Sequence, residues 1–144
     1  LRPGPISKEE IEQCLDCTVT EAFVDEEINS NSLKSPGMGS KHYSPITPII
    51  LKESFNALFF ENLNSNDDLI ICSSLEEEVN FSRYHFATLS LSKSGELNEI
   101  AKNLYHTLQI ADSMNKKRII MHKIEGSDNL AIAINDRLLR ASSG

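Results

Sequence analysis

Three adjacent side chains that could bind a ligand, Lys41, His42 and Tyr43, lie in the stretch SPGMGSKHYSP (residues 35–45). They combine a cation, a proton carrier and an aromatic ring. The prolines and glycines around them predict irregular backbone, so the stretch is a connecting segment. A plain spacer would be filled with serine, glutamate and more glycine. The composition therefore raises the hypothesis that this connector contacts a ligand.

The elements that would position this connector begin at Pro48 and alternate between strands and helices. Short, continuously apolar runs predict buried strands at residues 49–51, 69–74, 85–91 and 118–124. Apolar residues at helical spacing predict helices at residues 53–63, at 75–81 as a short helix or turn, from a Ser94 cap to about residue 111, and at 128–141. The long helix presents Leu97, Ile100, Leu104, Leu108 and Ala111, and the last helix presents Leu130, Ile134, Leu138 and Ala141.

Continuously apolar strands that alternate with helices are typical of a parallel sheet covered on both faces. With right-handed crossovers, the prediction is an α/β fold, a small three-layer Rossmann-like sandwich preceded by an extended linker. The predicted divisions are residues 1–32, a linker at 33–48, and an α/β domain at 49–144.

The carboxyl ends of the predicted strands, where such sheets usually bind ligands, carry no recognisable catalytic set. The chain lacks the acids of a phosphoacceptor receiver domain, the G-x-G-x-x-G of a dinucleotide site and the serine-rich loop of a flavodoxin. GMGSK (37–41) has the wrong spacing for a P-loop. The histidines share no metal-ligand spacing, so we expect no metal site, and we expect His122 to be a satisfied core residue. Taken alone, the α/β domain has the features of an accessory or binding module.

The charge distribution disfavours general binding of nucleic acids or membranes, since the net charge is −7. Residues 1–112 have a net charge of −10 and residues 113–144 of +3. A local basic surface remains an alternative to a solvated face; its members are Lys116, Lys117, Arg118, Lys123, Arg137 and Arg140. No run approaches the roughly 18 apolar residues of a membrane span.

The three cysteines, Cys14, Cys17 and Cys72, are sparse and odd in number, which predicts a reducing, cytoplasmic location. Cys14 and Cys17 form C-x-x-C at the end of a short predicted helix that Ser7 caps. Without a second pair they are best interpreted as two ordinary thiols. The rest of residues 1–32 shows no periodic apolar face, and we expect this segment not to pack stably on its own.

Three sequence stretches together resemble the long, two-domain form of threonylcarbamoyl-AMP synthase. They are LRPG at the start, the linker SPGM…KHYSP, and NDRLLRA at 135–141. NLYHTLQIAD (103–112) is also similar to the family. The resemblance implies a YrdC-like catalytic domain upstream, of which residues 1–32 hold the last part, joined by the linker to a C-terminal Rossmann-like accessory domain.

The resemblance also implies a function for the intact protein. Threonine, bicarbonate and ATP, with magnesium, are converted to threonylcarbamoyl-AMP and pyrophosphate, and a separate transferase complex then modifies tRNA. Because the ATP and threonine cavity belongs to the catalytic domain, this chain alone is expected to be inactive. The implied partners are that domain and, as further candidates, tRNA or the transferase complex. The alternative is a stand-alone α/β module that binds a ligand or a partner.

The family's site positions carry over by resemblance. Arg2 matches a nucleotide-contacting position, and His42 or Tyr43 is expected to touch the nucleotide. The linker would close over the active site and exclude water, with Lys41 adding positive potential. Its motif positions also include Pro36, Gly37, Met38 and Pro45. Arg137 and Arg140 are expected either to dock the catalytic domain or tRNA, or to form surface ion pairs. A linker that merely docks on the α/β domain remains the alternative.

Overall fold

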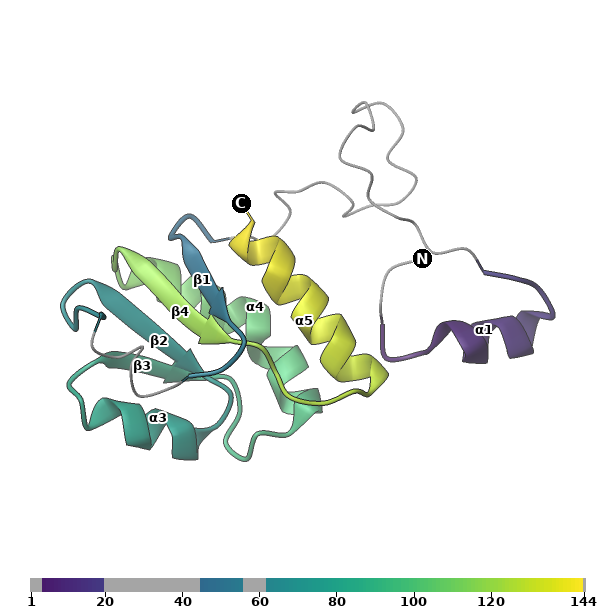
Figure 1. Cartoon of the computed structure of the whole chain (residues 1–144), viewed down its shortest axis with the longest axis horizontal. Coiled ribbons are helices and arrows are strands. Elements are labelled where there is room, and N and C mark those ends of the chain that lie inside the picture. The colour runs from purple at the N-terminus through teal and green to yellow at the C-terminus, as the bar shows by residue number, and fades with distance from the viewer. Residues whose placement is uncertain (1–3, 20–44, 56–61, 144) are drawn as a thin grey trace, which may run out of the picture.

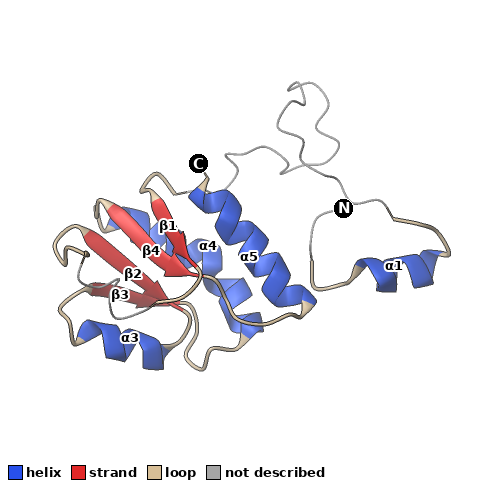
Figure 2. Cartoon of the chain, viewed as in Figure 1, coloured by secondary structure: helices blue, strands red, loops and turns tan. Residues whose placement is uncertain are grey.

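The computed structural model describes residues 4–19, 45–55 and 62–143, and its main body is a parallel sheet with helices on both faces (Figures 1 and 2). The strands are β1 (Ile49–Lys52), β2 (Asp68–Cys72), β3 (Ala87–Ser90) and β4 (Arg118–His122). The helices are α1 (Lys8–Leu15), α3 (Leu75–Ser82), α4 (Leu97–Ser113) and α5 (Asn129–Ser142). The four strands lie in the order β1-β4-β2-β3 and pair in parallel throughout. The predicted α/β class is confirmed.

The larger core lies between the sheet and the helices α4 and α5. The predicted apolar stripes are confirmed, because Ile100, Leu104 and Leu108 of α4 and Ile134 and Leu138 of α5 are buried. They pack on strand residues that are also fully buried. Burying one such side chain stabilises the fold by about 1.5–3 kcal/mol, so this face carries much of the stability.

The opposite face of the sheet has a smaller, aromatic core. Ile70, Cys72 and Ile120 point to this side, and the half-buried Phe55, Leu63, Phe81 and Phe86 pack on them. Phe55 and Phe81 meet edge to face with ring centroids 5.3 Å apart. This layer includes residues of α3 and the described ends of the segment that connects β1 to β2, Phe55 and Leu63. The predicted helix at 53–63 falls partly outside the described residues, and its described ends, residues 53–55 and 62–63, are not helical.

The predicted start of the long helix was wrong. Ser94 does not cap α4; Glu96 occupies the N-cap position and makes no side-chain cap bond. The backbone turns at Gly95, whose φ of +87° suits a residue without a Cβ, so the helix begins later. The Ser92 hydroxyl accepts the N–H groups of Ser94 (3.2 Å) and Gly95 (2.9 Å) and donates to Glu99 (2.5 Å).

Three further boundaries differ from the sequence prediction. The strand expected at 69–74 is Asp68–Cys72, because Ser74 already caps α3. The strand expected at 85–91 is only Ala87–Ser90, because His85 has a left-handed φ of +63° in the turn after α3. The strand expected at 118–124 ends at His122. The Ser7 cap of α1 is confirmed, since Ser7 and Glu10 form a reciprocal capping box, and α1 buries none of its residues.

Candidate functional site

The carboxyl edge of the sheet is where an α/β fold usually binds a ligand, and here it holds a linked set of polar groups. Glu77, in the first turn of α3, accepts hydrogen bonds from the backbone N–H and the hydroxyl of Ser73, at 2.7 and 2.9 Å. Its other oxygen lies 2.8 Å from Nε2 of His122, the last residue of β4. The set therefore joins the ends of the adjacent strands β2 and β4.

The contacts of His122 determine its protonation. Nδ1 lies 2.7 Å from the backbone carbonyl oxygen of Lys123, which can only accept, so Nδ1 carries a proton. Nε2 faces the Glu77 carboxylate, off the line of a straight hydrogen bond, and this contact is favourable only if Nε2 is protonated too. Burial alone would lower the pKa of His122, but Glu77 and the Lys123 carbonyl outweigh it and raise the pKa. The expected satisfied core histidine is therefore a partly buried group that forms an ion pair with Glu77 when it is protonated.

The other groups at this edge are bound to the domain itself. Lys123 pairs with Glu53 at 2.6 Å, and the side-chain amide of Asn135 closes the loop after β4 by bonding both the N–H and the carbonyl of Ile124, each at 2.9 Å. Burial raises the pKa of the Cys72 thiol, which keeps it protonated and unreactive. Among the described residues, no three histidines, cysteines or acids come together as a metal site. The polar groups of this edge that the structure describes bond to one another or to the backbone of the domain and so stabilise the fold.

The amino edge of the sheet, on the opposite side, receives the incoming chain. Asp112, in the last turn of α4, accepts the backbone N–H of Ile46 at 2.9 Å and that of Thr47 at 2.8 Å. Burial would raise the pKa of Asp112, but the hydrogen bonds from Thr47 and Ile46 lower it. A carboxylate near a helix C-terminus is unfavourable because of the helix dipole. The hydrogen bonds from Ile46 and Thr47 therefore explain why an acid occupies this position. One side chain thus fixes the chain just before β1; we call these contacts the Asp112 anchor.

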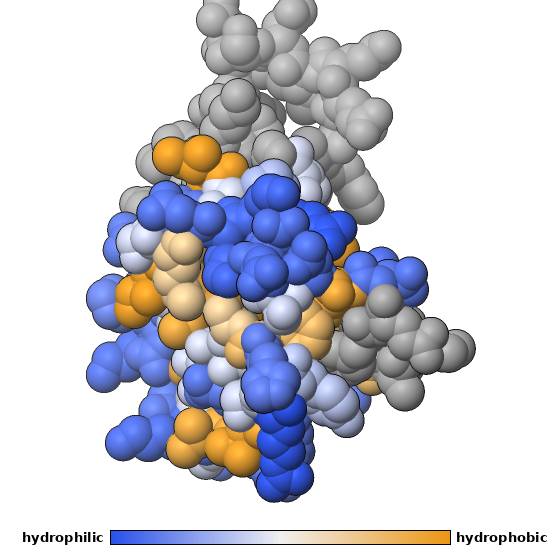
Figure 3. All heavy atoms as spheres, turned by 90° about the vertical axis from the view of Figure 1, so that its left-hand side faces the viewer, coloured by the Kyte–Doolittle hydropathy of each residue, from blue (hydrophilic) through white to orange (hydrophobic). Residues whose placement is uncertain are grey.

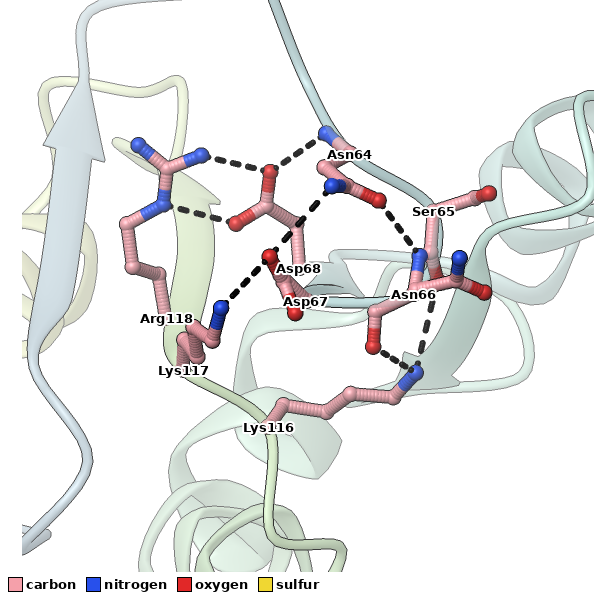
Figure 4. Close-up of polar contacts among 8 residues, drawn as sticks. All are labelled: Asn64, Ser65, Asn66, Asp67, Asp68, Lys116, Lys117 and Arg118. Atoms are coloured by element: carbon pink, nitrogen blue, oxygen red, sulfur yellow. Dashed lines mark hydrogen bonds and ion pairs between the residues drawn. The ribbon is translucent and has the colours of Figure 1, made fainter.

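A polar network beside this anchor joins the loop before β2 to the loop before β4 (Figure 4). Arg118 makes two parallel bonds of 2.7 Å to Asp68, whose carboxylate also accepts the N–H of Asn64 at 2.8 Å. Lys116 donates to the backbone carbonyls of Ser65 and Asn66, at 3.3 and 2.8 Å. Lys117 pairs with Asp67 at 3.0 Å. The amino edge is therefore a pre-organised surface built by two neighbouring loops.

The basic residues of the C-terminal third are bound within the domain and do not form a free basic face. Lys117, Arg118, Lys123 and Arg140 each pair with an acid, and Arg137 donates to the carbonyl of Ala133 at 2.7 Å. The expected pair of Arg140 with Asp136 is confirmed at 3.0 Å. Docking of another molecule by Arg137 or Arg140 stays a prediction.

Comparison with known proteins decides the family. Residues 6–143 match the family described as "Threonylcarbamoyl-AMP synthase, C-terminal domain". The chain belongs to this family. It is also 29% identical over 160 residues to threonylcarbamoyl-AMP synthase from Schizosaccharomyces pombe, covering 99% of this chain and 38% of the relative. The chain therefore spans well under half the length of this relative, and the resemblance seen in the sequence is confirmed.

Most of the site residues predicted for this family lie outside the described residues: Arg2, Pro36, Gly37, Met38, Lys41, His42 and Tyr43. Pro45 is described; it is half-buried and directly precedes the anchored Ile46. Sequence reasoning missed Asp112 because its partners are backbone groups 65 and 66 residues away. It also missed Asn135, whose partner is the backbone of Ile124, although Asn135 opens the motif NDRLLRA.

None of the described helices has the length and apolar character needed to cross a membrane.

Proposed function

We propose that this domain is the accessory part of a threonylcarbamoyl-AMP synthase and that it holds the linker that closes over the active site. The intact enzyme would form threonylcarbamoyl-AMP from threonine, bicarbonate and ATP, for the modification of tRNA. The family assignment supports the reaction. The observation that carries the accessory role is the seating of residues 46 and 47 on α4, because it ties the end of the linker to a folded body.

The chemistry of the reaction explains why such a linker is useful. The product is a mixed anhydride of a carbamate and AMP, and both carbamate and product react with water. A tethered flap would exclude water while the reaction takes place and would reopen afterwards to release pyrophosphate. His42 or Tyr43 would contact the nucleotide and Lys41 would add positive potential. Gly37 and Gly39 would act as hinges.

The proposal is tested in the intact protein, with its catalytic domain. Pyrophosphate release with ATP, threonine and bicarbonate is compared between wild type and the double variant His42→Ala/Tyr43→Ala. We expect turnover to fall by about 100-fold, as for the loss of groups that position a substrate. A Ser40→Ala variant, in the same linker, is the control and should keep its activity. Unchanged turnover in the double variant would make the linker a spacer.

A further inference from the structure

One side of the sheet ends in β3, which has no further strand beside it among the described residues. The N–H of Leu91 donates to the carbonyl of Cys72 in β2, at 2.9 Å. Because the backbone groups of successive residues point alternately to the two sides of a strand, those of Thr88 and Ser90 point outward. Such outward N–H and carbonyl groups can pair with a strand of another chain. Four residues are too few to hold a partner alone, so a neighbouring element must contribute.

The helix beside this strand, α3, turns an apolar flank in the same direction. Glu77 points to β4, and Glu78 points to Thr88 of β3. Val79 lies about 100° further round the helix and therefore beyond β3, with Leu75 on the same side one turn earlier. Val79 is 47% exposed and Leu75 is 46% exposed. Figure 3 shows apolar side chains at the surface on the lower side of the molecule, where α3 and β3 lie in Figure 1.

A second copy of this chain would cover both features with one symmetry axis. If two β3 strands pair antiparallel about a twofold axis at Leu89, Thr88 lies opposite Ser90 of the second copy, and the two residues exchange both backbone hydrogen bonds. The Thr88 hydroxyl donates to Glu78 at 3.3 Å, which places the middle of α3 beside the middle of β3. The same axis therefore brings Val79 next to Val79 of the second copy.

The distance between the two copies of α3 also agrees with such a dimer. The helix packs on both β2 and β3, so its axis lies above the space between them, about 2.4 Å inside β3. The twofold axis would lie about the same distance outside β3. The two helices would then run antiparallel about 10 Å apart, which is a usual distance between packed helices.

The charges of α3 favour a copy of the same chain over an unrelated strand. Its first turn carries three acids, Glu76, Glu77 and Glu78, and the exposed Arg83 is its C-cap. In the antiparallel arrangement the acidic end of each helix lies beside Arg83 of the other, and the helix dipoles are opposed. An extended peptide would pair with β3 but has no helix to cover the apolar flank of α3.

We propose that β3 and the apolar flank of α3 form the interface of a symmetric dimer, with a second copy of this chain as the partner. The interface would be isologous, because each copy contributes the same strand and the same helix. It is small, one short strand and two helical turns from each copy. The dimer should therefore dissociate reversibly on dilution.

The first test is sedimentation velocity of the full-length protein over a range of concentrations. Wild type should dimerise as the concentration rises. Val79→Glu should raise the Kd of the dimer at least about tenfold, because two carboxylates then meet at the axis. Ile132→Glu in α5 is the matched control, since Ile132 is 48% exposed, and it should dimerise like wild type. Circular dichroism shows whether each variant is folded.

The second test is disulfide cross-linking, which locates the contact. Cys14 and Cys17 are replaced by serine, and the buried Cys72 stays. On mild oxidation Val79→Cys should form a covalent dimer, because the axis brings the two thiols together, whereas Ile132→Cys should remain monomeric.

A wild-type protein that stays monomeric at every concentration would overturn the proposal and leave β3 to a different partner. A dimer that Ile132→Glu weakens and Val79→Glu does not would place the interface elsewhere and would also overturn it. Cross-linking through residue 132 but not through residue 79 would do the same.

Discussion

Asp67 and Asp68 are neighbours in sequence, yet their surroundings differ, so we expect the two carboxylates to contribute differently to the free energy of unfolding. The Asp68 side chain is fully buried and holds both Arg118 and the N–H of Asn64. Burial would raise the pKa of Asp68, but the Arg118 guanidinium and the Asn64 N–H lower it. Asp67 makes an exposed pair with Lys117.

Asp68→Ala should therefore lower the free energy of unfolding by about 1–3 kcal/mol, because it removes the buried carboxylate that accepts hydrogen bonds from Arg118 and from the N–H of Asn64. Asp67→Ala, the matched control one residue away, should cost less than about 1 kcal/mol, as exposed ion pairs do. Urea denaturation followed by circular dichroism measures both. Equal losses for the two variants would refute the distinction.

The pair of Glu77 and His122 makes stability depend on pH in two opposite ways. His122 has a raised pKa, so its contribution is complete below its ordinary value of 6.5 and is lost as the pH rises through the raised value. Burial would raise the pKa of Glu77, but His122 and Ser73 lower it. The contribution of Glu77 is therefore complete above 4.5 and is lost as the pH falls through the lowered value.

Glu77→Gln should accordingly reduce the free energy of unfolding by about 1–3 kcal/mol between pH 4.5 and 6.5, with a smaller difference on either side. Urea denaturation at a series of pH values measures the difference from wild type. Glu76→Gln removes an exposed acid from the same helical turn and should have little effect. If the difference in free energy of unfolding between Glu77→Gln and wild type did not vary with pH, His122 would be neutral over this pH range.

At the scale of elements, the loop before α4 shows how a side chain outside a helix can determine where the helix begins. Ser92 satisfies two backbone donors and is held by Glu99, whose pKa is lowered by the Ser92 hydroxyl and the Lys93 N–H. Ser92→Ala should cost about 1–2 kcal/mol and speed amide exchange at Ser94 and Gly95, since it removes their acceptor. Ser94→Ala, at the residue that the sequence suggested as the cap, should be nearly neutral. A larger loss of stability for Ser94→Ala than for Ser92→Ala would indicate that Ser94 is the cap.

The elements themselves were largely predictable from the sequence, for an identifiable reason. The strands β2 and β4 are buried on both faces and read as continuous apolar runs, and α4 and α5 bury one stripe each. These patterns need no tertiary information. Two of the boundaries failed where backbone conformation decides, at Gly95 and His85, both with positive φ. The site was harder to predict, because Asp112 and Asn135 bind backbone groups, whose positions no residue spacing reveals.

At the scale of the whole molecule, the two edges of the sheet have different tasks. The carboxyl edge, where this class of fold usually binds ligands, is closed by the contacts of Glu77, His122 and Asn135. The amino edge holds the incoming chain through Asp112. This division agrees with the proposal that the domain acts by holding the linker in position.

The most direct test of this account is the turnover of the intact enzyme with Asp112→Ala, measured as pyrophosphate release with ATP, threonine and bicarbonate. Ser113→Ala is the matched control, since the Ser113 hydroxyl only donates to the carbonyl of Ile110 in its own helix. Circular dichroism confirms that both variants are folded. The account predicts that Asp112→Ala lowers turnover by about tenfold or more while Ser113→Ala retains it, because the freed linker no longer reaches its closed position. Equal turnover in the two folded variants would contradict the claim that this domain positions the linker.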